Sequence, residues 1–150
     1  MHLRIKDYAA LAIASVTVAL MIAVTFTQSI LRFEIDGVRN DDGVIHILVF
    51  DDAQAFDRSE YTRVFKYATL PARAGRMNAK IDGVGPGRYA VMVHHDENGN
   101  ERLDMDGESP VEGWAYTGSA GAEAVPTFAA AAFDHTPAAS PVPIAMLYAN

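Results

Sequence analysis

The sequence has 150 residues, a formal net charge of −7 and no cysteine. This length is typical of one domain. The acidic balance excludes the basic surface expected of a nucleic-acid-binding protein, and the lack of cysteine excludes disulfides, thiolate metal sites and a cysteine nucleophile.

The first predicted element is a hydrophobic helix over residues 8–26, which carry no charged side chain. At a rise of 1.5 Å per residue it spans about 28 Å, close to the hydrocarbon thickness of a bilayer, about 30 Å. Basic residues before it and acidic residues after it predict that the following domain lies in the periplasm or outside the cell. We expect residues 1–29 to be an uncleaved inner-membrane anchor, because residues 24–29 offer no clean signal-peptidase site. Secretion after cleavage of a signal segment is the alternative.

Residues 30–150 are predicted to form one all-β domain, because no helical periodicity lasts three turns. Residues 76–81 alternate between apolar and polar side chains, which indicates a strand with one wet face. Residues 44–50 are apolar on both faces apart from His46, which indicates a central strand with a packed or hydrogen-bonded histidine. We therefore expect an antiparallel β-sandwich of about seven strands, like the immunoglobulin fold. The predicted strands cover residues 31–35, 44–50, 61–70, 76–81, 88–95 and 142–148, with a weaker one at 127–133. The alanine-rich residues 120–132 are compatible with a short helix instead.

An acidic segment follows the strand at residues 88–95. Between residues 96 and 112 there are seven carboxylates and one arginine, a local charge of −6. Ca²⁺ takes 6 to 8 oxygen ligands, and alternate side chains of a tight loop converge on it. The spacing here matches positions 1, 3, 5, 7 and 9 of a calcium loop. The candidate ligands are Asp96, Asn98, Asn100, the backbone carbonyl of Arg102, and Asp104.

The match to a calcium loop is incomplete. Glu101 stands where an EF-hand has glycine, and Gly107 stands where it has a bidentate glutamate. Asp106, Glu108 and Glu112 are candidates to complete the ligand shell. The alternative is a polar loop whose side chains bond to its own backbone.

Three histidines and the single tryptophan are further candidates. His94 and His95 are adjacent in a strand and point to opposite faces, so they are not expected to chelate one metal together. Each is expected to bond to the following loop, and ligation by one of them, alone or with His135, is the alternative. Trp114 is expected to cover the core beside this acidic segment. The alternative is that it lines a ligand cleft. The sequence contains no catalytic motif with a nucleophile elbow, phosphate loop or zinc-protease helix.

Five blocks of the sequence form a recognisable set. They are Gly-Val-Gly-Pro-Gly-Arg-Tyr-Ala-Val at residues 83–91, His-Asp-Glu-Asn-Gly-Asn at 95–100 with Leu103 and Asp104, Pro-Val-Glu-Gly-Trp at 110–114, Pro-Thr-Phe at 126–128 and Ala-Ala-Phe at 131–133. Together they are similar to the DUF2141 family of exported bacterial proteins. The family usually has glycine in place of Glu101 and Gly-Ile-Pro in place of residues 108–110. The resemblance implies a sandwich of the transthyretin-like or carboxypeptidase-regulatory-like type and brings no catalytic residues.

We therefore expect a non-catalytic binding or structural module of the cell envelope, with its acidic loop ordered by Ca²⁺. A protein or glycan of the envelope would be its partner. One alternative is a small metal-dependent hydrolase that uses His94 or His95 with Asp96 and Glu112. Another is an accessory subunit that docks onto an envelope complex through a sheet edge or its anchor.

Overall fold

The computed structural model describes residues 29–118 and 125–149. The hydrophobic helix predicted over residues 8–26 lies outside these ranges. Within them, no helix has the length and apolar character needed to cross a membrane. The described chain is mostly β, as predicted, and most of its strand pairs are antiparallel. The parallel pair of β1 and β10 and a few short helices depart from the all-β, antiparallel prediction.

One sheet has three strands in the order β10-β1-β4. Strand β1 (Ser29–Val38) lies in the centre, antiparallel to β4 (Gly75–Val84) and parallel to β10 (Val142–Ala145). In β4 the apolar side chains of Met77, Ala79 and Ile81 are buried, while the polar residues between them are exposed. The prediction of a strand with one wet face is therefore confirmed.

The other sheet has the order β3-β2-β5-β8, and β9 (Phe133–His135) also pairs with β5. Strand β2 (Val44–Phe50) lies between β3 (Lys66–Pro71) and β5 (Gly87–Asp96), and β8 (Gly113–Tyr116) continues the sheet beyond β5. All of these pairs are antiparallel.

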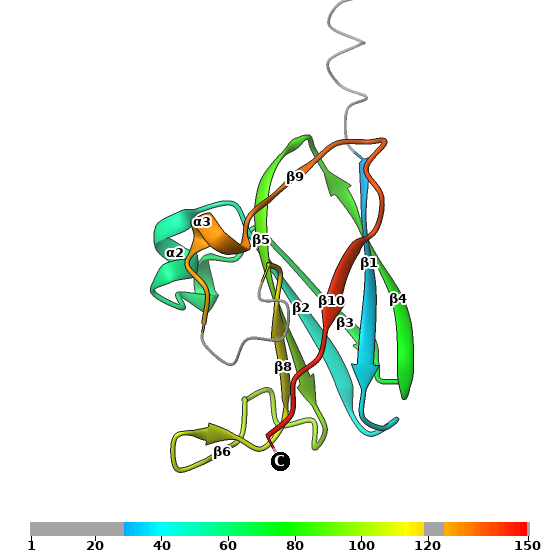
Figure 1. Ribbon diagram of the computed structural model, residues 1–150, viewed down its shortest axis with the longest axis vertical. Coiled ribbons are helices and arrows are strands. Elements are labelled where there is room, and N and C mark those ends of the chain that lie inside the picture. The colour runs from blue at the N-terminus through cyan, green and yellow to red at the C-terminus, as the bar shows by residue number, and fades with distance from the viewer. Residues whose placement is uncertain (1–28, 119–124, 150) are drawn as a thin grey trace, which may run out of the picture.

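The two sheets face each other across one hydrophobic core. Figure 1 shows β1, β4 and β10 on one side of the domain and β2, β5 and β8 on the other. Every second residue of β2 is buried between the sheets, which follows from the two-residue period of a strand. The inward residues of the central strands are Leu31, Phe33 and Ile35 in β1, Ile45, Ile47 and Val49 in β2, and Tyr89, Val91 and Val93 in β5.

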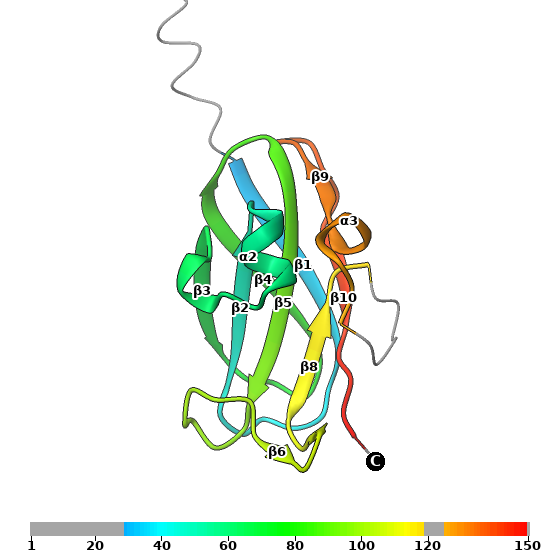
Figure 2. The same ribbon diagram turned by 90° about the vertical axis from the view of Figure 1, so that its left-hand side faces the viewer.

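A second apolar cluster covers the opposite face of the larger sheet. It joins two short helices, α2 (Ala53–Asp57) and α3 (Phe128–Ala131), to one end of β2, β5 and β8. Val64, which follows the short helix η1 (Tyr61–Arg63), also packs against this cluster. Figure 2 looks onto this face, with α2 lying in front of β2 and β5. Phe56 of α2 is central, since its ring meets Phe50, Tyr116 and Phe128 edge-on. The helices cover only part of the face, and the rest borders the loop after β5.

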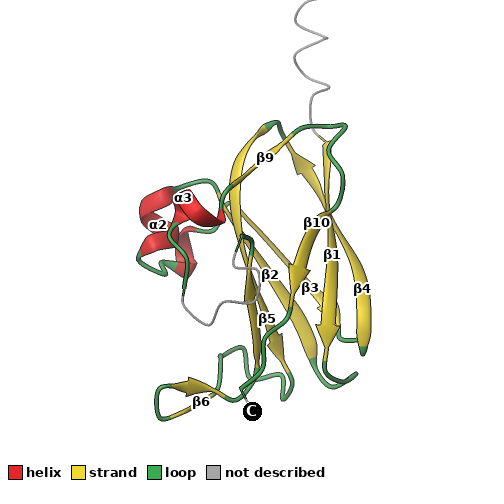
Figure 3. Cartoon of the chain, viewed as in Figure 1, coloured by secondary structure: helices red, strands yellow, loops and turns green. Residues whose placement is uncertain are grey.

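Most predicted strands are present, with several differences, and the one predicted at residues 142–148 ends at Ala145. The strand predicted at residues 61–70 begins only at Lys66, because residues 61–63 form the helix η1. The segment at 127–133 contains α3 before β9, so the short helix is the correct alternative there. Strand β8 was not predicted. The two-residue strands β6 (Met105–Asp106) and β7 (Ser109–Pro110) form a small hairpin within the acidic segment. Figure 3 shows how little helix the described chain contains.

Gly43 sets the close approach between the turn before β2 and the end of β5. Its φ is +65°, and a Cβ atom at this position would lie 1.9 Å from the carbonyl oxygen of Asp96. Gly75, at the start of β4, has a similar φ of +87° but has no atom within 4 Å of the Cβ position. The two glycines therefore share a backbone conformation and differ in the space around them.

We predict that Gly43→Ala destabilises the protein more than Gly75→Ala. Both substitutions place a side chain in the left-handed region, at a cost of about 1–2 kcal/mol. Only Gly43→Ala also forces two backbone segments apart, which adds about 1–3 kcal/mol. The free energy of unfolding, measured by denaturant titration, checks this. Equal losses for the two variants would show that the contact between Gly43 and Asp96 is not tight.

Candidate functional site

The end of β5 is organised by the buried carboxylate of Asp96, which has no exposed surface. Its Oδ1 accepts hydrogen bonds from the backbone N–H groups of Gly99 and Asn100, at 2.7 and 3.1 Å. Its Oδ2 accepts from the N–H of Glu101 at 2.8 Å and from Nε2 of His46 at 3.2 Å. Burial opposes the charge of Asp96, but these donors outweigh that effect and lower its pKa. Asp96 is therefore an anion, and the backbone of the following loop turns around its carboxylate.

Glu112 plays the same part from the other end of the acidic segment, and only 4% of it is exposed. Its Oε1 accepts from the N–H of Glu97 at 2.9 Å. Its Oε2 accepts from the N–H of Asp104 at 3.1 Å and from Nε2 of His94 at 2.9 Å. Glu112 thus ties both ends of the loop at residues 97–104 to the sheet. We call these residues the acidic loop.

The side chains inside the acidic loop converge on Asp104. The amides of Asn98 and Asn100 both donate to its carboxylate. The oxygen of Asn98 accepts the N–H of Asn100 at 3.0 Å, and the oxygen of Asn100 accepts the N–H of Arg102 at 2.8 Å. Glu101 lies at φ +62°, a conformation that favours glycine. This explains why a glycine is suited to that position.

The predicted calcium ligands therefore fall into two groups. Asp96, Asn98, Asn100 and Asp104 are joined by hydrogen bonds or share bonding partners, and Glu112 lies against the same loop. The exposed Asp106 and Glu108 lie on the β6–β7 hairpin, and within the described residues no hydrogen bond or ion pair joins them to that group. Within the described residues, no three His, Asp or Glu side chains are arranged to hold a metal ion. The calcium site, which relies partly on asparagine and backbone oxygens, stays a prediction.

The histidines divide between the two faces of the sheet, as predicted for adjacent strand residues. His94 bonds to Glu112 on the outer face, whereas His95 points to the other side and is fully buried. Nδ1 of His95 bonds to the hydroxyl of Tyr148 and its Nε2 to the carbonyl of Asp42, both at 2.8 Å. His135 pairs with Gly87 at the opposite end of β5, so it does not meet His95.

His46 and His94 face each other across β2 and β5, with ring centroids 5.6 Å apart. Nδ1 of His46 bonds to the hydroxyls of Tyr67 and Thr69 from β3. His46 is thus the hydrogen-bonded histidine that the sequence predicts. Trp114 likewise belongs to the second apolar cluster, with 8% of its surface exposed.

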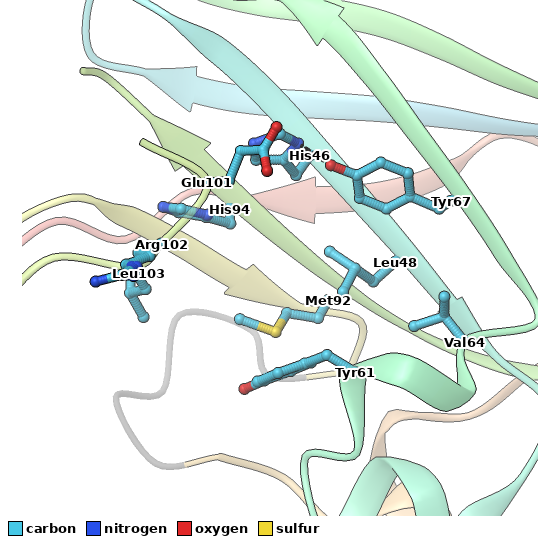
Figure 4. Close-up of a pocket in the computed structure, with 10 residues that line it drawn as sticks. All are labelled: His46, Leu48, Tyr61, Val64, Tyr67, Met92, His94, Glu101, Arg102 and Leu103. Atoms are coloured by element: carbon cyan, nitrogen blue, oxygen red, sulfur yellow. Dashed lines mark hydrogen bonds between the residues drawn. The ribbon is translucent and has the colours of Figure 1, made fainter. Parts of the chain in front are cut away.

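A groove of about 500 Å³ opens on this face, between the acidic loop and the helix η1. Figure 4 shows its polar end, where Glu101, His46 and Tyr67 gather, and its apolar end. The apolar end is formed by Leu48 and Met92 from the sheet, by Tyr61 of η1 and by Val64, which follows η1. The remaining lining residues are His94, Arg102 and Leu103.

The groove was not predicted from the sequence. The alternation in residues 44–50 places His46 and Leu48 on one face, and the position of Met92 and His94 follows from the same rule. The sequence did not show which part of that face the short helices leave uncovered, so the groove itself could not be predicted. No sequence pattern marks Tyr67 as a groove residue. Its position there depends on a hydrogen bond to His46, which lies 21 residues earlier in the chain.

We predict that Glu112→Gln destabilises the protein by about 1.5–3 kcal/mol, the usual worth of a hydrogen bond to a charged group. The amide has one acceptor oxygen and presents an NH₂ group to donors. Glu108→Gln is the matched control, since Glu108 is exposed, and it should change stability by less than about 0.5 kcal/mol. Similar effects of the two substitutions in denaturant unfolding would contradict the role assigned to Glu112.

A family model described as an uncharacterized protein conserved in bacteria (DUF2141) matches residues 33–142. No curated protein and no solved structure matches the chain. The matched range contains β2 to β9, the acidic loop and every residue of the groove. The chain therefore belongs to the DUF2141 family.

Proposed function

We propose that this protein is a non-catalytic binding module of the bacterial cell envelope, which takes its ligand in the groove on the larger sheet. The observation that carries the proposal is the composition of the groove, which combines an apolar floor with a few convergent polar groups. Binding sites for small molecules commonly have this composition. The two facing sheets support assignment to the sandwiches of the transthyretin-like or immunoglobulin-like type.

The proposed location rests on the sequence. Residues 8–26 anchor the chain in the inner membrane, and the domain lies in the periplasm or outside the cell. Secretion after cleavage remains the alternative. A reporter fused to the C-terminus and the mass of the native N-terminus distinguish these topologies.

We further propose that Ca²⁺ orders the acidic loop. This proposal is supported by the convergence of the residues at positions 1, 3, 5 and 9 of the calcium-loop spacing. In that group Asn98 and Asn100 both bond to Asp104. Rotation of a side-chain amide exchanges its oxygen and nitrogen with little change of shape. Carboxylate, amide and carbonyl oxygens in a flexible loop suit Ca²⁺, whereas Mg²⁺ demands near-octahedral geometry.

The loop also forms one wall of the groove, through Glu101, Arg102 and Leu103. Ordering of the loop would therefore organise that wall. With Glu101 in place of glycine and no closing glutamate, we expect a dissociation constant on the order of 10⁻⁴ to 10⁻³ M, as in extracellular modules.

Thermal melting of the full-length chain in mild detergent tests this proposal. Ca²⁺ at about ten times its dissociation constant should stabilise the folded state by about 1.4 kcal/mol, which raises Tm by a few degrees. Mg²⁺ at equal ionic strength should give less. Asp104→Asn should abolish the difference between the ions, and Asp82→Asn, an exposed control on β4, should preserve it. An equal response to both ions would leave the segment as a polar loop only.

A small metal-dependent hydrolase remains the second candidate function, because one contact in the structure favours it. Glu112 holds Nε2 of His94, as a carboxylate orients a general base. The rest of the predicted set is not joined to it, since His95 lies on the other face and Asp96 bonds to His46. The groove is lined by no Ser, Thr, Cys or Lys among the described residues. A hydrolytic activity that His94→Ala abolishes in a folded protein would favour the enzyme.

A further inference from the structure

The hydrogen bonds of His46 and His94 determine where their protons lie. Each Nε2 bonds to a carboxylate oxygen, of Asp96 for His46 and of Glu112 for His94. When these oxygens accept, each Nε2 carries the hydrogen, and in the neutral tautomer each Nδ1 keeps a lone pair. The hydroxyls of Tyr67 and Thr69 bond to the Nδ1 atom of His46.

Nδ1 of His94 has no such partner. Among the described residues no hydrogen bond joins this nitrogen, although only 6% of His94 is exposed. It also differs from Nδ1 of His135, which is sealed from solvent as well as unpartnered. Because His94 lines the groove, its free lone pair is available to a hydrogen-bond donor on a ligand.

The charges around the polar end favour a positive donor. Glu101 lines the groove there, and the buried Asp96 and Glu112 lie behind the two imidazoles. Arg102 is the single cationic side chain among the described lining residues. Three carboxylates against one guanidinium make this end of the groove favourable to a cation.

An aromatic ring at the polar end reinforces this preference. Tyr67 lines the groove beside His46 and is 54% exposed. The face of an aromatic ring attracts an organic cation. Toward the apolar end, Leu48, Val64 and Met92 offer an apolar surface, which the ring of Tyr61 extends.

We propose that the groove binds an organic ammonium ion whose charged end meets Glu101 and Nδ1 of His94 and whose apolar body lies over Met92. This inference rests on the proposed binding function and specifies the chemical class of the ligand. An anionic ligand of the same shape would meet a carboxylate and an imidazole lone pair, both of which repel it.

Three small probes of similar size test the inference on the full-length chain in mild detergent at pH 7.5. They are 2-phenylethylammonium, 2-phenylethanol and 3-phenylpropanoate. Titrations followed by the ¹³C-methyl NMR signal of Met92 report binding in the groove itself. We expect the ammonium ion to bind at least about tenfold more tightly than the carboxylate, with the alcohol between them.

A matched pair of variants assigns the preference to its cause. Glu101→Gln should reduce the preference for the ammonium ion to less than about threefold, because it removes the charge that contacts the ligand. Glu108→Gln removes the same charge outside the groove and should leave the preference unchanged. If both variants weaken the preference for the ammonium ion equally, the preference comes from the net negative charge of the protein rather than from the groove. That result would overturn the inference.

The remaining outcomes separate this inference from the function on which it rests. Equal binding of all three probes at Met92, or tighter binding of the carboxylate, would overturn the cation preference and leave the groove as a binding site. A Met92 signal that no probe perturbs would overturn both.

Discussion

Two carboxylates that lie out of solvent, Asp96 and Glu112, hold this end of the domain together. Burying a charge costs several kcal/mol unless hydrogen bonds replace its water. Asp96 regains them from three backbone N–H groups and one imidazole, and Glu112 from two N–H groups and one imidazole. Each bond of this kind is worth about 1.5–3 kcal/mol. The loop and the two histidines are therefore positioned by the same pair of carboxyl groups.

The sheet provides the geometry that makes this possible. Antiparallel pairing sets His46 opposite His94 and His94 opposite Trp114, and the alternation of strands keeps all three on the outer face. Gly43 allows the turn before β2 to approach the backbone at Asp96. On the outside of the loop, Glu97 bonds to Arg39, whose guanidinium lies over the ring of Tyr148 at 4.6 Å. The acidic loop is thus fastened from both sides.

Local pattern was sufficient for most strands and for the faces of their side chains. The alternation in residues 76–81, the central strand at 44–50 and the opposed His94 and His95 all follow from the two-residue period. Strand β8 was missed because its four residues carry no such pattern and are buried on both faces. The helix η1 was missed because its apolar neighbours suit a strand equally well.

The site was only partly predictable for a related reason. The spacing of Asp96, Asn98, Asn100 and Asp104 correctly indicates residues that come together in a loop. The alternative of a polar loop that bonds to its own backbone agrees with the bonds of Asp96. The spacing does not reveal which N–H groups Asp96 and Glu112 accept, since that depends on backbone conformation rather than on residue type. The groove depends on segments distant in sequence, as the pairing of β2 with β3 places Tyr67 beside His46.

Amide hydrogen exchange measures the role of the two carboxylates most directly. The N–H groups of Glu97, Gly99, Glu101 and Asp104 all bond to Asp96 or Glu112. If these bonds persist in solution, the four amides exchange at least about a hundredfold more slowly than unprotected amides, although they lie in a loop. Exchange of these four amides at the rates of an unfolded chain would contradict the account, because the buried carboxylates would then not be holding the loop.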